Sequence, residues 1–129
     1  MIYLTKEEVI TIHMVIMKRY GEGEQSGIKD HHLLESAIFR PQQTVFGEDA
    51  YKSLFDKGAA LFESLVKNHS FYNGNKRTAF VCTDIFLKKN GYKIKKQDKI
   101  NEDFTVSIAD GSSTFEDIVK WLQNNTEEK

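Results

Sequence analysis

The 129-residue chain has very little cysteine and proline, and each shortage excludes a class of protein. The single cysteine, Cys82, rules out a disulfide framework and a zinc site built from cysteines. The single proline, Pro41, together with apolar residues spread along the whole sequence, argues against a disordered chain. No apolar run approaches the roughly 20 residues that a membrane-spanning helix needs. We therefore expect a folded protein outside the membrane.

The chain also lacks an excess of either charge, since 18 lysines and arginines face 19 aspartates and glutamates. This balance argues against a polycationic nucleic-acid binder, although it leaves room for a local basic site. The start, MIYLTKEEV, has neither the basic nor the apolar region of a signal peptide. We expect a single cytoplasmic domain that spans residues 1–129.

Apolar residues recur at helical spacing between polar capping residues, which predicts an all-α domain. The expected helices cover 5–20, 30–40, 49–68, 75–90, about 101–110 and about 114–123. Capping boxes are expected at Thr5 with Glu8 and at Ser113 with Glu116. Helix 75–90 is so apolar that we expect it to be the central, mostly buried one. Residues 42–47 are expected to form a small hairpin, and 92–94 a short strand.

The polar segment His-Ser-Phe-Tyr-Asn-Gly-Asn-Lys-Arg-Thr, residues 69–78, lies between the two most apolar helices. It opens the second of them, where unpaired backbone amides and the helix dipole attract anions. Gly74 would let a phosphate approach the backbone closely, while Lys76 and Arg77 would supply charge. His69 is the residue type most often used as a general base. We expect Phe71 to point inward and anchor the loop.

The same segment also fits an ordinary connection between two helices. Asn73-Gly74 is a common turn, Asn75 could cap the following helix, and His69 could end the preceding one. Chemistry alone leaves both interpretations open.

The segment resembles the signature loop of the Fic/Doc family, His-x-Phe-x-Asp/Glu-Gly-Asn-Gly/Lys-Arg. Lys76, where adenylylating Fic enzymes usually carry glycine, is similar to the death-on-curing (Doc) toxin branch. The resemblance extends along nearly the whole chain, through segments 3–5, 27–30, 33–37, 40–41, 86–87 and 90–91.

The resemblance implies a Fido-type bundle of about six helices with a short β-hairpin flap, which transfers part of ATP to a protein hydroxyl. His69 would be the general base. Gly74, Asn75 and Lys76 would form an anion hole, with the side chains of Asn75 and Lys76 on the phosphates. Arg77 would neutralise the charge that develops on the transferred group.

In the Doc branch, the implied protein is the toxin of a type II toxin–antitoxin system that phosphorylates a translation factor such as an elongation factor. The wider family implies transfer of AMP, and a degenerate domain that only binds nucleotide or antitoxin is a further alternative. An antitoxin in trans is implied because a self-inhibitory Ser/Thr-x-x-x-Glu-Gly/Asn helix is missing: Ser112-x-x-x-Glu116 is followed by Asp117. A flap would dock the target by strand addition, or be a plain surface loop; it comprises Gln42, Gln43, Thr44, Val45 and Phe46.

The chain departs from the family pattern at Asn73, where the family carries the acidic ligand of Mg²⁺. An amide oxygen can bind Mg²⁺ but lacks the charge that a hard cation prefers. Three interpretations follow: the phosphates of ATP hold the metal, the activity is slow, or catalysis has been lost. The second arginine of many adenylylating motifs is replaced by Phe80, which again is similar to Doc.

The other candidate residues have simpler explanations. His13, His31 and His32 lack partners at metal-binding spacing, and we expect them to face solvent on helices. The lysines between residues 88 and 99 are expected to form a solvated face, because no interleaved aromatic residues supply a platform for nucleic-acid bases. Salt-dependent binding of DNA or RNA would favour the alternative, a nucleic-acid-associated domain.

Overall fold

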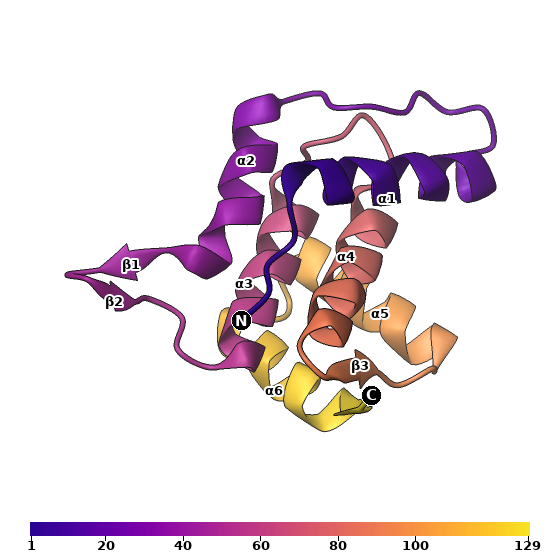
Figure 1. Cartoon of the computed structure of the whole chain (residues 1–129). Helices are drawn as coiled ribbons and strands as arrows, with labels where there is room; N and C mark the ends of the chain where they lie inside the picture. Colours follow the sequence, from indigo (N-terminus) through magenta and orange to yellow (C-terminus); the bar gives the residue numbers. More distant parts are fainter.

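The computed structural model describes all residues, Met1–Lys129, and confirms a predominantly α-helical fold with six helices (Figure 1). The helices are α1 (Lys6–Tyr20), α2 (His31–Phe39), α3 (Leu54–Lys67), α4 (Asn75–Lys89), α5 (Asp98–Ala109) and α6 (Phe115–Asn125). A 3₁₀ turn, η1 (Arg40–Gln42), follows α2. Strands β1 (Thr44–Val45) and β2 (Glu48–Asp49) pair with each other, as do β3 (Tyr92–Ile94) and β4 (Thr126–Glu128); both pairs are antiparallel. No helix has the length and apolar character to cross a membrane.

Side-chain caps determine where most of the helices begin. The Thr5–Glu8 capping box starts α1 as expected, and the Asp30 carboxylate accepts from the Leu33 amide at the start of α2. The expected start of the third helix at Asp49 is wrong, since Asp49 lies in β2 and a capping box from Ser53 to Asp56 starts α3.

The last helix also begins one residue later than the sequence suggested. The Ser113 hydroxyl is buried and forms a hydrogen bond with the Ser107 hydroxyl (2.7 Å), so it does not cap the helix. Thr114 caps α6 instead, in a box with Asp117 rather than Glu116. Because Ser113 and Thr114 both carry a hydroxyl group, either could cap the helix. The buried hydrogen bond of Ser113 leaves Thr114 as the cap.

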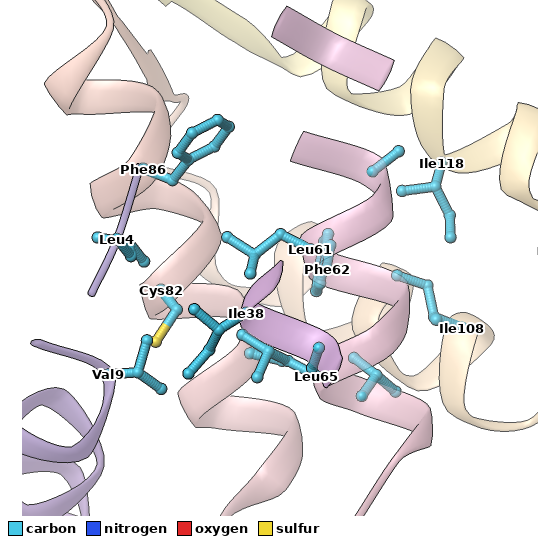
Figure 2. Close-up of a cluster of buried hydrophobic side chains, with 14 of the residues drawn as sticks. Leu4, Val9, Ile38, Leu61, Phe62, Leu65, Cys82, Phe86, Ile108 and Ile118 are labelled. Atoms are coloured by element: carbon cyan, nitrogen blue, oxygen red, sulfur yellow. The ribbon is translucent and has the colours of Figure 1, made fainter. Parts of the chain in front are cut away.

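The central helix is α3 rather than α4, which corrects the expectation from the apolar content of 75–90. Nine of the 14 residues of α3 are buried, and it packs against α2, α4, α5 and α6. Its Gly58 allows a close approach by α6, because a Cβ there would lie 3.3 Å from Leu122 Cδ1. Figure 2 shows Leu61, Phe62 and Leu65 of α3 in the middle of the core.

The predicted hairpin is formed by β1 and β2 and stands out from the bundle at the left of Figure 1. Its residues are exposed, and Phe46 at the tip has a positive φ of 52° and a fully exposed side chain. Gln42, expected in the flap, belongs to η1 instead. The base of the hairpin is fastened by the buried Lys57, whose ammonium group donates to the Tyr51 carbonyl and to Asp49 (3.1 Å).

Arg40 also stabilises the base of the hairpin, because it joins Tyr51, which follows β2, to α3. Its Nε donates to the Tyr51 hydroxyl (2.9 Å), and its Nη1 donates to Glu63 (2.8 Å) and Ser64 (2.9 Å). The guanidinium also lies over the rings of Tyr51 and Phe115, at 5.3 and 5.5 Å from their centres. A planar group with several donors fits this position, and an ammonium group does not.

We therefore expect Arg40→Lys to lower the free energy of unfolding by about 2 kcal/mol, because at least one charged hydrogen bond and the stacking are lost. Urea denaturation measures the change. Lys99→Ala, which removes an exposed salt bridge to Asp103, serves as the control and should change stability by less than about 0.5 kcal/mol. Equal effects of the two variants would contradict a special role of the guanidinium.

Candidate active site

The loop between α3 and α4 is held by the segment before α2. The amides of Lys29 and Asp30 both donate to the Ser70 carbonyl (2.8 and 3.1 Å), and the Tyr72 amide donates to the Gly27 carbonyl (3.1 Å). Residues 28 and 71 form an isolated antiparallel bridge. The loop therefore has a short, strand-like contact on one side instead of being free in solvent.

The side chain of Asn75 fixes the loop from the other side. Its Oδ1 accepts from the Phe71 amide and its Nδ2 donates to the Phe71 carbonyl, both at 3.0 Å. The Phe71 side chain is buried, as expected of an anchor. Both polar atoms of the Asn75 side chain thus hold the loop, and the backbone amide of Asn75 is one of those at the start of α4.

The start of α4 is left without a side-chain cap. Gly74 is the N-cap residue in the left-handed conformation (φ 74°), and the first helical hydrogen bond runs from the Thr78 amide to the Gly74 carbonyl (2.9 Å). The preceding three amides of the helix have no partner within it. The left-handed conformation favours glycine, and a Cβ at position 74 would lie only 2.7 Å from Met17 Sδ, so any other residue would also require the Met17 side chain to move.

A cleft of about 680 Å³ opens beside this helix start, between α4 and α5. One wall consists of the residue before α4 and the first turns of that helix: Gly74, Asn75, Lys76, Arg77, Phe80 and Val81. The facing wall belongs to α5: Asp98, Asn101, Glu102, Thr105 and Val106. Tyr20 of α1 also lines the cleft. Lys76 and Arg77 are exposed and take part in no salt bridge. With the free amides, they make this end of the cleft a place for an anion.

Arg77 is oriented by an aromatic ring rather than by an acid. Its Cζ lies 3.9 Å from the centre of the Tyr20 ring, which is a close cation–π contact. A carboxylate partner would compete with a phosphate for the guanidinium, and an aromatic face does not. Sequence analysis missed Tyr20 and the α5 wall, because nothing in the chain order relates these positions to the motif.

His69 and Asn73 lie in the same loop but do not line this cleft. His69 is exposed and adopts a left-handed backbone conformation (φ 51°) directly after the last residue that caps α3, Asn68. Glycine is the usual residue at such a position, so a histidine there costs about 1 kcal/mol or more of backbone strain. Strain of this kind is frequent at functional sites.

Asn73 uses its side-chain amide to hold a neighbouring loop, since Nδ2 donates to the Gln25 carbonyl (3.0 Å). No group of three or more acidic, histidine or cysteine side chains gathers there or elsewhere in the chain. The residues present therefore do not form a carboxylate site for Mg²⁺, and a metal at this loop would depend on ligands that a nucleotide brings.

The other candidates from the sequence separate into two groups. His31 and His32 are exposed on α2 as expected, but the expectation is wrong for His13, which is fully buried against Phe71. Of the lysines between 88 and 99, four form salt bridges, which agrees with a solvated surface; they are Lys88, Lys89, Lys93 and Lys99.

The Asn75 contacts predict an unusual sensitivity to a nearly isosteric change. In Asn75→Asp, a carboxylate oxygen would face the Phe71 carbonyl, so we expect a loss of about 1–3 kcal/mol of stability despite the favourable position of a negative charge at a helix start. Asn124→Asp, at an exposed position of α6, is the matched control and should change little. Thermal and urea unfolding measure both, and a tolerated Asn75→Asp would show that the amide is dispensable.

Comparisons with known proteins agree with the motif and its setting. Residues 3–87 match the sequence model of the Fic/DOC family. The chain is 42% identical over 92 residues to a protein of Mycolicibacterium smegmatis named "Toxin Doc", covering 71% of this chain and 67% of that protein. It is 29% identical over 121 residues to the "Protein kinase doc" of Escherichia phage P1, covering 94% and 93% of the two chains. The match to the family extends over most of the chain and includes the loop and the first turns of α4, and the chain belongs to the Fic/DOC family.

Proposed function

We propose that this protein is a Doc-type toxin that transfers the γ-phosphoryl group of ATP to a hydroxyl group of a target protein. The observation that carries the proposal is the uncapped start of α4, where free amides lie beside Lys76 and Arg77. The relatives support it, because one is named as a toxin and the other as a protein kinase.

In the proposed reaction, the oxygen of the target hydroxyl bonds to the γ-phosphorus while the bond from that phosphorus to the β,γ-bridging oxygen breaks, and ADP leaves. His69 accepts the proton of the hydroxyl, the role for which imidazole is most often used. The amides at the start of α4 and the side chains of Lys76 and Arg77 stabilise the charge on the phosphates. The Arg77 guanidinium stacks on the Tyr20 ring and has no carboxylate partner that would compete with a phosphate.

The metal requirement follows from Asn73. ATP is expected as its Mg²⁺ complex, with the ion held mainly by phosphate oxygens, because the loop supplies an amide where a carboxylate would bind Mg²⁺ more strongly. A catalytically degenerate domain is the second candidate, and the observation that favours it is the use of the Asn73 amide to bind Gln25.

The proposal includes two protein partners. The target, which we propose to be a translation factor in the cytoplasm, would pair an extended segment with the exposed β1–β2 hairpin, with residues 43–46 as the docking flap. An antitoxin would restrain the protein in trans, as the relative named as a toxin suggests, and the nearest string to a self-inhibitory motif, Ser112-x-x-x-Glu116, departs from it at Asp117. Toxicity of the wild type, relieved by a co-expressed antitoxin, would support this part of the proposal.

The first experiment is intact-mass analysis of elongation factors incubated with the protein, ATP and Mg²⁺. A gain equal to one phosphoryl group supports the proposed reaction, and a gain equal to one adenylyl group would assign the protein to AMP transfer instead. His69→Ala should lower the rate by about 10²–10⁴-fold and Arg77→Ala by about 10²–10³-fold. His32→Ala, at an exposed position on α2, should retain full activity. Bound ATP without any mass gain would favour the degenerate domain.

Replacing the amide of Asn73 by a carboxylate tests the interpretation of the metal. We expect Asn73→Asp to lower the half-saturating Mg²⁺ concentration by about fivefold or more, since a charge near the ion adds about 1 kcal/mol or more even in water. Asn73→Ala also loses the hydrogen bond to Gln25 but adds no charge, so it serves as the control. Identical Mg²⁺ titrations for all three proteins would disprove a metal-related role of this position.

A further inference from the structure

A histidine that the motif does not include is buried behind the loop of the candidate site. His13 of α1 is fully buried, and its ring stacks on Phe71 with 3.8 Å between ring centres and 11° between planes. Its Nδ1 lies 3.2 Å from the Thr78 hydroxyl on α4, and its Nε2 accepts from the Gly27 amide at 3.1 Å. One side chain thus contacts the loop anchor, the first turns of α4 and the segment that pairs with the loop.

The partners determine the protonation state of the ring. Because the Gly27 amide can only donate, Nε2 must carry a lone pair. In a neutral imidazole the proton then sits on Nδ1, from where it is donated to the Thr78 hydroxyl. A protonated ring would carry an N–H at both nitrogens, and the one on Nε2 would oppose the Gly27 N–H.

We propose that His13 is a positioning residue for the anion-binding loop, and that it holds the loop only in its neutral form, through one donated and one accepted hydrogen bond. His13 contacts the loop directly, by stacking on Phe71. It also acts on the loop indirectly, because it binds the Gly27 amide and the Gly27 carbonyl in turn accepts from the Tyr72 amide. The expected effect of His13 on ATP binding rests on the proposed function, whereas its effect on the loop does not.

The surroundings make the neutral form the stable one. Burial lowers the pKa of the His13 imidazole below its ordinary 6.5, and the residues one turn away on α1 are apolar: Val9, Ile10, Ile16 and Met17. The charged or titratable groups on the elements packed against the ring lie at or near the surface and none bonds to it: Glu22, Glu24, Lys29, Asp30, His69, Lys76 and Arg77. The stabilisation of the loop is therefore complete above pH 6.5 and is lost as the pH falls below this value and through the lowered pKa.

Three variants separate the parts of this interaction. His13→Gln can still accept from Gly27 through its amide oxygen but cannot titrate, whereas His13→Phe keeps the ring and its stacking and loses both hydrogen bonds. His32→Gln changes an exposed histidine of α2 and is the control. We would measure amide hydrogen exchange at Gly27, Phe71 and Tyr72, and the affinity for MgATP, from pH 7 to pH 5.

We expect His13→Phe to raise exchange at these amides and to weaken MgATP binding by about tenfold or more, because a buried donor and acceptor lose their partner. His13→Gln should stay within about threefold of the wild type at pH 7. After correction for intrinsic exchange, protection should fall on acidification in the wild type and in His32→Gln, and stay constant in His13→Gln.

Unchanged exchange in His13→Phe, or the same loss on acidification in His13→Gln as in the wild type, would overturn the proposal. If His13→Phe does not fold, the comparison of His13→Gln with the wild type across pH decides alone. If the wild type does not bind MgATP, the proposed function is wrong, and the exchange data still decide whether His13 holds the loop.

Discussion

The two hydrogen bonds between the Asn75 side chain and the Phe71 backbone are the contacts on which the candidate site depends. They join the end of the loop to its middle, so that a side chain at the first position of α4 closes the turn that leads into it. Asn75 therefore does not cap its own helix, and Gly74 has no side chain with which to do so. The use of the Asn75 side chain by the loop therefore has two consequences: the loop is fixed, and the first amides of α4 have no side-chain cap.

The rest of the structure supports this loop from α1 and from the segment before α2. α1 lies across the first turns of α4 (Figure 1), where His13 bonds to Thr78, Met17 fills the space that a side chain at position 74 would need, and Tyr20 stacks on Arg77. These contacts lie on successive turns of one helix face. A rigid helix thus positions the loop anchor, the glycine and the arginine together, which is the kind of support that a preorganised anion site requires.

Features that depend on neighbours in sequence could be predicted, and features that depend on packing could not. The Thr5–Glu8 box, the Asp30 cap and the loop itself follow from local hydrogen-bonding rules. His13 was misassigned because a histidine on an apolar face looks the same in sequence whether or not its partners exist; its spacing from Val9 and Ile16 was the one available signal. The central position of α3 depends on small residues such as Gly58, which hydrophobicity alone undervalues.

The replacement of an acid by Asn73 changes the balance of charge in the loop. A carboxylate would help to hold a metal but would also repel a phosphate, whereas the Asn73 amide adds no negative charge beside Lys76, Arg77 and the helix amides. The acidic residues of the cleft, Asp98 and Glu102, lie on its α5 wall. The start of α4 therefore favours an anion over a cation. In the proposed reaction this places the metal with the nucleotide, so that binding of ATP and binding of Mg²⁺ become one event rather than two.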